Sequence, residues 1–267
     1  MNKIKTIIFD WAGTTIDYGS LAPISAFMSA FRVFGIETTI EEIRAPMGMQ
    51  KRAHIVKMLS EPRLTDLWKE KYGREAKETD IDGIYDCFES SLLKQLGSHA
   101  KVLPGVIETI DKLRETGLKI GSTTGYTRKM MDVVIPLAAG QGYEPDCLVC
   151  PDEVGGIGRP YPYMLWRNLE KLGCDDICEV IKVGDTKADI LEGKKAGCIS
   201  IGVVKGSNML GLTEEETDKM SSVEESELFD KVIKSYIDAQ ADYVIEDITK
   251  LPSLIDRINK QKENSDV

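Results

Sequence analysis

The 267-residue sequence contains no long apolar run, no internal repeat and no low-complexity tract. No stretch approaches the roughly 18 consecutive apolar residues that a membrane-spanning helix needs. The N-terminal segment also lacks the apolar core of a signal peptide, because Asp10 interrupts its only candidate run. We therefore expect a cytoplasmic protein with no membrane partner.

Positive charge is also scarce in this sequence. Acidic residues outnumber basic ones by 44 to 34, the formal net charge is −10 at pH 7, and no dense basic run is present. A nucleic-acid-binding surface needs the opposite balance, so we expect no nucleic-acid partner. An anionic ligand must instead be bound by local positive charges.

Only six cysteines and two histidines are present. A zinc site is one interpretation, since Cys147 and Cys150 have CxxC spacing and Cys174 and Cys178 lie one helical turn apart. However, the segment around Cys147 alternates like a strand, which places Cys147 and Cys150 on opposite faces. We therefore predict that the cysteines are buried free thiols, and we assign no role to His99.

Three apolar segments end in polar residues that can carry out chemistry. They span residues 7–9, 118–124 and 180–185, and they end in Asp10, a run of hydroxyls and Asp185. Short apolar runs of this kind are typical of buried parallel strands, and doubly wound sheets bind ligands at the carboxyl ends of such strands. We therefore expect an α/β fold with a doubly wound, mostly parallel, Rossmann-like sheet core.

These strand ends predict a site for a metal ion and a phosphoryl group. Asp10 can act as a nucleophile or a metal ligand, although it can equally cap the turn that follows. If a helix starts after Asp185, Asp189 lies one turn along and faces the same site. Three carboxylates form an oxygen-ligand set that suits Mg²⁺.

Residues between about 21 and 100 show helical periodicity instead of strand signals. Apolar residues recur at helical spacing, Thr39 marks a helix start and Pro62 a break. We predict a helical cap domain at 21–100, inserted in a core formed by 1–20 plus 101–260. Residues 261–267 are expected to fray.

Several motifs resemble those of one enzyme superfamily. Asp10 with Gly13-Thr14, the hydroxyls at 122–124 and Gly184-Asp185-x-x-x-Asp189 are similar to the haloacid dehalogenase superfamily of aspartyl-phosphate-forming enzymes. Within it, the chain resembles the phosphonatase family from about residue 4 to 250. The more specific matches are Phe-Asp-Trp-Ala-Gly-Thr-Thr, Pro-Met-Gly-x-x-Lys, Gly-Ser-Thr-Thr-Gly-Tyr-Thr-Arg, Gly-Arg-Pro-Tyr-Pro and Lys-Val-Gly-Asp-Thr.

This resemblance implies an activity. It implies hydrolysis of the carbon–phosphorus bond of phosphonoacetaldehyde to acetaldehyde and phosphate, in the degradation of 2-aminoethylphosphonate. It also implies Mg²⁺ as cofactor and a homodimer formed through the cap, with residues 28–34 as the expected contact. Asp10, Asp185 and the Ala12 carbonyl are the implied metal ligands, while Asp189 holds metal-bound waters.

Ala12 and Lys51 explain why the phosphonatase family fits better than other branches. Phosphatases and mutases of the superfamily carry Asp two residues after the nucleophile as general acid, whereas Ala12 has no proton to give. Cleavage of a carbon–phosphorus bond instead leaves a carbanion, which a protonated imine between Lys51 and the aldehyde can accept. Lys51 needs a lowered pKa for this role, and burial can provide it. Taken alone, it could be an ordinary surface lysine.

The remaining site residues follow from the same resemblance. His54, three residues after Lys51, is expected to relay protons; its alternative is a helix histidine bonded to a neighbour. Arg159 is expected to bind phosphoryl oxygens; its alternative is an exposed loop arginine. The other expected substrate contacts are Thr123, Thr124, Tyr126, Met47 and Gly48. Ser122 stays open as a phosphate contact, packing against the following turn stays open for Tyr126, and a tight-turn role stays open for Gly48.

Three rival functions fit these residues less well. A phosphate-ester hydrolase or phosphomutase needs no lysine but needs the acid that Ala12 replaces. A non-catalytic phosphate or phosphonate binder leaves Asp10, Asp185 and Lys51 unexplained. A haloacid dehalogenase needs no metal, so the carboxylate set argues against it.

Overall fold

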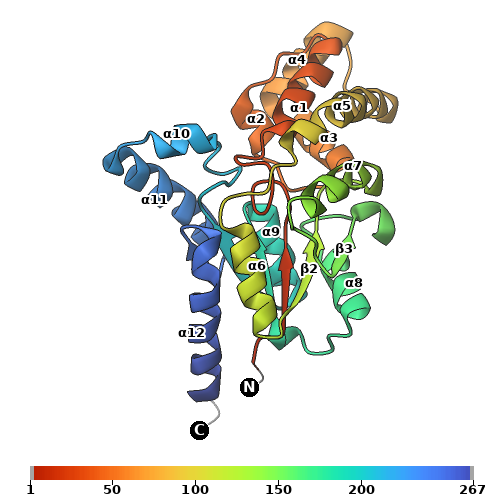
Figure 1. Cartoon of the computed structure of the whole chain (residues 1–267). Helices are drawn as coiled ribbons and strands as arrows, with labels where there is room; N and C mark the ends of the chain where they lie inside the picture. The colour runs from red at the N-terminus through yellow and green to blue at the C-terminus, as the bar shows by residue number, and fades with distance from the viewer. Residues whose placement is uncertain (1–2, 265–267) are drawn as a thin grey trace.

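The apolar run before Asp10 forms the central strand β1 (Thr6–Phe9) of a parallel sheet (Figure 1). It lies between β2 (Lys119–Thr123) and β4 (Val180–Gly184) and pairs with both in parallel register. The computed structural model describes residues 3–264, and within this range the sheet has six strands in the order β3-β2-β1-β4-β5-β6. The expected doubly wound parallel core is confirmed.

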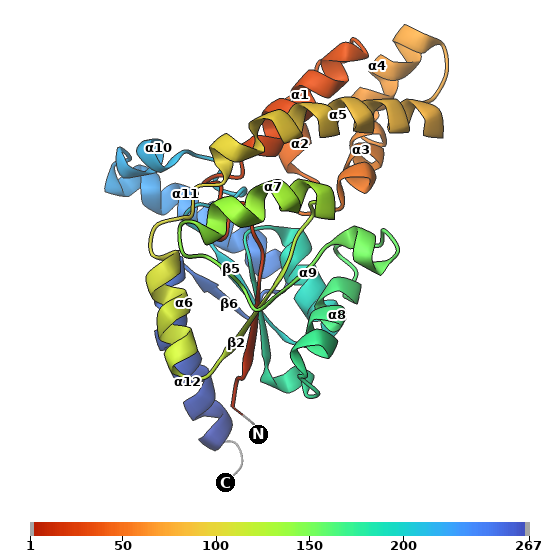
Figure 2. The ribbon, with the colours of Figure 1, turned by 45° about the vertical axis from the view of Figure 1, so that its right-hand side comes forward.

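The remaining strands extend the sheet on both sides and are also parallel. They are β3 (Cys147–Val149), β5 (Ile199–Val203) and β6 (Tyr243–Ile245). Helices α6 and α12 cover one face of the sheet, and α8 and α9 cover the other (Figure 2). All carboxyl ends therefore open at one edge.

The helices of the core follow the strands in alternation. Their bounds are α6 (Val106–Glu115), α7 (Arg128–Ala139), α8 (Tyr163–Leu172), α9 (Lys187–Ala196), α10 (Glu214–Asp218), α11 (Ser222–Asp238) and α12 (Leu251–Asn264). Short 3₁₀ turns occupy Pro151–Val154, Ile177–Glu179 and Ile248–Lys250.

Five further helices lie beyond the carboxyl end of β1, within the part of the chain that the structure describes (Figure 1). These cap helices are α1 (Ala22–Val33), α2 (Ile40–Arg44), α3 (Lys51–Leu59), α4 (Pro62–Tyr72) and α5 (Glu78–His99). Thr39 caps α2 through a capping box with Glu42, as the sequence suggested. Phe27 of α1 and Phe88 of α5 stack with ring centroids 4.0 Å apart, which joins these two helices.

Two expectations need correction. Helix α12 continues to Asn264, so residues 261–264 of the expected frayed end are helical, whereas 265–267 lie outside the described residues. All six cysteines are free, as predicted, but only Cys150 and Cys198 are buried and Cys178 is exposed.

Within the described residues, none of the helices combines the length and the apolar composition that a membrane span requires.

Candidate active site

Three carboxylates meet at the carboxyl edge of the sheet. Asp10 follows β1, Asp185 follows β4 and Asp189 lies in the first turn of α9; one oxygen of each lies within 4.8 Å of the others. All three are buried. Burial, and then the charge of Asp10, raise the pKa of Asp185 well above its usual range. A divalent cation would remove this repulsion, so the set fits an oxygen-ligated metal ion.

The turn after Asp10 closes around Asp185. One oxygen of Asp185 accepts a hydrogen bond from the Thr14 hydroxyl (3.2 Å), and the other accepts one from the Asn208 backbone N–H (2.7 Å). Gly13 has φ +87°, and a Cβ there would lie 2.1 Å from Asp185 Oδ2. Only glycine therefore permits this approach.

Asp189 is bound on its other side by cations. Its Oδ1 lies 2.9 Å from Arg159 Nη1 and 3.0 Å from Lys182 Nζ, and its Oδ2 accepts from the Thr186 hydroxyl. Although burial raises the pKa of Asp189, the charges of Arg159 and Lys182 hold it below the usual value. Asp189 thus anchors two cations beside the metal-type cluster.

Arg159 is 2% exposed, so its interpretation as an exposed loop arginine is wrong. Its Nη2 donates to Asp10 Oδ1 (2.8 Å) and to the Thr123 hydroxyl (2.7 Å), while its Nε donates to Glu192 (3.0 Å). Burial lowers the pKa of the guanidinium, but the neighbouring carboxylates outweigh this and raise it. A permanent positive charge therefore lies against the candidate nucleophile.

Lys182 and Glu192 are functional candidates that the sequence analysis missed. Both side chains are fully buried, and Lys182 Nζ lies 3.0 Å from the Thr123 hydroxyl and 3.3 Å from Glu192 Oε2. A usable signal existed, because Lys182 interrupts an apolar strand covered on both faces. The Thr123 hydroxyl is therefore part of this ion network and does not line the pocket described below.

The two neighbouring hydroxyls have different surroundings. Ser122 Oγ donates to the carbonyl of Cys147 in the adjacent strand (3.1 Å), whereas Thr124 lines the pocket. Within the described residues, Thr124 is therefore the only one of the three strand-end hydroxyl residues that lines this pocket.

Lys51 begins α3 and is 3% exposed, so it is not a surface lysine. Its Nζ lies 3.8 Å from Met47 Sδ and 5.1 Å from the ring centre of Tyr126. Burial lowers the pKa of Lys51 to about 8; Asp10 opposes this shift, and the positive charge of Arg159 favours it. The amine is therefore mainly protonated at pH 7, with a minor neutral fraction.

His54 is also fully buried, one turn after Lys51 on α3. Its ring lies against Phe27, with centroids 4.1 Å apart, and neither ring nitrogen makes a hydrogen bond of ordinary geometry within residues 3–264. Burial and the nearby Lys51 lower the pKa of His54 well below its usual value, so the ring is neutral. It does not line the pocket.

One small cavity of about 20 Å³ brings the cap and core residues together. It is lined by Asp10, Ala12, Ser20, Met47, Gly48, Lys51, Thr124, Gly125, Tyr126, Arg159 and Thr186. Gly48 has φ +87°, and a Cβ there would lie 2.3 Å from the Thr186 hydroxyl, so the cap touches the core directly. The volume is about that of a single water, which indicates a closed cap. Ser20 is the lining residue that no sequence signal pointed to.

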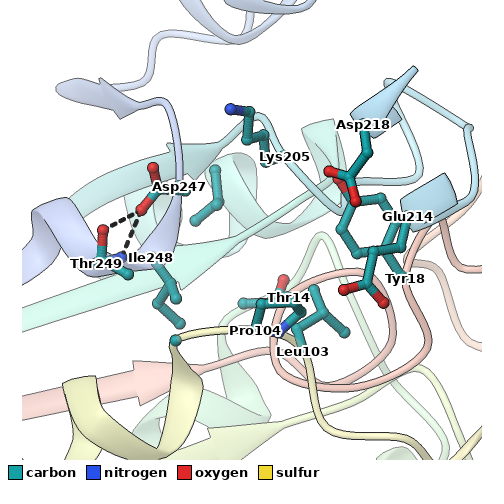
Figure 3. A pocket seen from close by; sticks show the side chains of 12 residues that line it. Thr14, Tyr18, Leu103, Pro104, Lys205, Glu214, Asp218, Asp247, Ile248 and Thr249 are labelled. Atoms are coloured by element: carbon teal, nitrogen blue, oxygen red, sulfur yellow. Dashed lines mark hydrogen bonds between the residues drawn. The ribbon is translucent and has the colours of Figure 1, made fainter. Parts of the chain in front are cut away.

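A roomier pocket of about 300 Å³ lies beside the carboxyl ends of β5 and β6 (Figure 3). Three of its charged groups have partners: Lys205 pairs with Glu246, Glu214 with Lys101, and Asp247 accepts from the Thr249 backbone. The chemistry described above belongs to the smaller cavity.

Comparisons with known proteins agree with this geometry. The family model of haloacid dehalogenase-like hydrolases matches residues 4–197, and a second model of that superfamily matches 156–251. The chain is 47% identical to the phosphonoacetaldehyde hydrolase of Bacillus cereus (strain G9842) over 260 residues, which covers 97% of this chain and 98% of that protein.

Two other matches extend this similarity. A bifunctional phosphonoacetaldehyde hydrolase/aminoethylphosphonate transaminase of Clostridioides difficile is 46% identical over 99% of this chain, which corresponds to 41% of that longer protein. A crystal structure of a phosphonoacetaldehyde hydrolase-like protein from Oleispira antarctica superposes with a TM-score of 0.94 at 36% identity, covering 97% of this chain and 94% of the other.

Proposed function

Because this chain belongs to the haloacid dehalogenase-like hydrolases and, within them, to the phosphonoacetaldehyde hydrolases, we propose how its own residues cleave a carbon–phosphorus bond. The enzyme hydrolyses phosphonoacetaldehyde to acetaldehyde and phosphate. The observation that carries the proposal is that Asp10, Ala12 and Lys51 line one closed cavity.

Lys51 activates the substrate as an imine. With a pKa of about 8, roughly one Lys51 side chain in ten is neutral at pH 7 and can add to the aldehyde carbon. Loss of water then gives a protonated imine next to the carbon–phosphorus bond. We propose that His54, held neutral by burial, relays protons during this step, acting through a bridging water.

Asp10 then attacks phosphorus opposite the carbon leaving group. The electron pair of the broken bond moves into the imine and forms an enamine on Lys51. Because no leaving-group oxygen needs protonation, the reaction does not require a general acid at the position of Ala12. Water hydrolyses the aspartyl phosphate to free phosphate and restores Asp10. Protonation of the enamine at carbon and hydrolysis of the resulting imine release acetaldehyde.

The charge of the phosphonate is balanced by cations around it. We propose Arg159 and Thr124 as phosphoryl contacts, Thr123 through its bond to Arg159, and Tyr126, Met47 and Gly48 as the walls around the aldehyde. Mg²⁺ held by Asp10, Asp185 and the Ala12 carbonyl would neutralise phosphoryl charge, with Asp189 holding its waters.

We further propose a two-domain organisation and a dimer. The core comprises residues 1–20 plus 101–260 and the cap 21–100, whose closure excludes water from the cavity. Val33, at the end of α1, is 70% exposed, which supports residues 28–34 as a contact between two copies. The cytoplasm is the proposed location.

Ester hydrolysis is the rival activity on this fold. It requires a general acid that Ala12 cannot provide, and its absence lowers the rate by roughly 10²–10⁴. A buried lysine with a pKa near 8 has no task in such a reaction.

Borohydride trapping tests the imine directly. The enzyme is incubated with phosphonoacetaldehyde and borohydride, and the adduct is located by peptide mass mapping. We expect a reduced adduct on Lys51, and Mg²⁺-dependent phosphate release that Lys51→Ala abolishes. Lys57→Ala, on the same helix but exposed, should keep both. Absence of both adduct and phosphate would refute the assignment.

A further inference from the structure

Arg44, the last residue of α2, reaches from the cap into the core. Its Nη1 donates to the carbonyls of Asn208 (2.7 Å) and Gly19 (3.2 Å), and its Nη2 donates to the carbonyl of Gly211 (2.9 Å). Asn208 returns a bond from its side-chain amide to the Arg44 carbonyl (3.4 Å). Arg44 therefore fastens the cap to the core loop 204–211 and to the segment that enters the cap.

The acceptors of Arg44 are unusual for an arginine. Among the residues described, its guanidinium forms no salt bridge, and its hydrogen bonds go to carbonyl or amide oxygens. Gly211 has φ +72°, and a Cβ there would lie 2.6 Å from Arg44 Cζ. The guanidinium is thus packed against bare backbone, a geometry that depends on Gly211.

The loop held by Arg44 also holds a carboxylate of the active site. Asn208, which is 1% exposed, donates its backbone N–H to Asp185 Oδ2 at 2.7 Å. The same residue accepts Arg44 on both its carbonyl and its side-chain oxygen. A continuous path of hydrogen bonds therefore runs from the cap helix through Asn208 to Asp185.

We propose that Arg44 is a positioning residue that couples closure of the cap to metal binding at Asp185. In the closed cap, Arg44 holds core loop 204–211 in place. The backbone N–H of Asn208 then points at Asp185 and orients its carboxylate to bind the cation. Because coupling between two events is reciprocal, a bound cation also favours the closed cap. The proposal rests on the proposed metal site, but not on the identity of the substrate.

The test compares two cap arginines. Arg44→Ala removes the bonds to the core, whereas Arg63→Ala removes bonds that stay inside the cap, to Glu42 and the Glu37 carbonyl. Mn²⁺ is used as the probe, and its Kd is measured by calorimetry without substrate. We expect Arg44→Ala to weaken Mn²⁺ binding about tenfold and to speed hydrogen exchange at the Asn208 amide. Arg63→Ala should change neither.

Two further measurements separate positioning from general stability. Millimolar guanidinium should partly restore Mn²⁺ affinity in Arg44→Ala and do nothing in Arg63→Ala. Gly211→Ala, which displaces the guanidinium but keeps the charge, should weaken Mn²⁺ binding as Arg44→Ala does. Unchanged Mn²⁺ affinity in folded Arg44→Ala and Gly211→Ala would overturn the proposal, whereas loss of phosphonoacetaldehyde turnover alone would concern the proposed reaction.

Discussion

The amine of Lys51 lies among Met47, Tyr126 and Phe27 instead of in water. Its pKa is about 8 in the folded protein and about 10.5 when the chain is unfolded. Between these two values the unfolded chain binds more protons than the native one, so stability rises with pH through this window. Below pH 8 the folded protein carries the full penalty of a buried ammonium group.

Replacing Lys51 should therefore stabilise the protein at neutral pH. Lys51→Met keeps the volume and removes the charge, and we expect the free energy of unfolding to increase by about 3 kcal/mol at pH 7. The gain should shrink to below about 1 kcal/mol at pH 10, where the native lysine is neutral. Urea denaturation at both pH values measures the difference, with the exposed Lys57→Met as control. An equal gain at both pH values would contradict the pKa assigned to Lys51.

Single residues also show what the sequence could and could not reveal. Asp10, Asp185 and Lys51 were predictable because each stands at a strand end or in a distinctive motif. Ser20 and Arg44 were not, because they act through loops that meet only in the folded chain. Lys182 was predictable in principle, since a lysine in an apolar strand needs a buried partner.

At the scale of elements, β4 and α9 are joined by charge as well as by apolar contact. Lys182 on β4 pairs with Asp189 and Glu192 on α9, and all three side chains are fully buried. Gly193 allows this close packing, since a Cβ there would lie 2.9 Å from Lys182 Cβ and 2.3 Å from Ser200 Oγ. Strand β4, which Asp185 follows, and helix α9, which carries Asp189, are thus held in a fixed position relative to each other.

Removing the Lys182 cation while its partner carboxylates remain should lower the free energy of unfolding. Lys182→Met leaves Glu192 and Asp189 with Arg159 as their only cation from this network, and we expect a loss of about 3–5 kcal/mol in the free energy of unfolding. The double variant Lys182→Met with Glu192→Leu should recover much of this, because it removes one charge of each sign. Chemical denaturation measures both values. As a control, Lys234→Met breaks the exposed pair of Lys234 with Asp238 on α11 and should change stability by under about 0.5 kcal/mol. A double variant as unstable as the single one would argue against charge imbalance as the cause.

Elements were predicted well where one local signal decided them. Apolar runs located the strands, and the Thr39 capping box and Pro62 located helix boundaries. The polar composition of residues 261–264 does not reveal that α12 extends through them, although Ile255 and Ile258 pack the same helix on the core. The packing of cap on core could not be predicted, since it depends on contacts such as Gly48 with Thr186.

At the scale of the whole molecule, the active site concentrates negative charge in a protein that is already acidic. Four buried carboxylates, at Asp10, Asp185, Asp189 and Glu192, face two buried cations at Arg159 and Lys182 within the described residues of this network. This network has a formal excess of two negative charges, and Lys51, which is mostly protonated at pH 7, offsets part of it. A divalent cation bound at these carboxylates would neutralise the remainder.

Metal removal should therefore destabilise the whole fold. We expect the Tm in a chelator to lie roughly 5–10 °C below the value in Mg²⁺ at about 100 times its Kd. Asp185→Asn removes one buried charge, while its amide oxygen can still accept the Asn208 N–H and its NH₂ can donate to Thr14. In chelator this variant should melt above the wild type, and Mg²⁺ should no longer raise its Tm. Calorimetry at matched ionic strength measures both effects. If the variant melts below the wild type in chelator, Asp185 stabilises the metal-free fold through its hydrogen bonds. Its uncompensated charge would then not be what destabilises the metal-free protein.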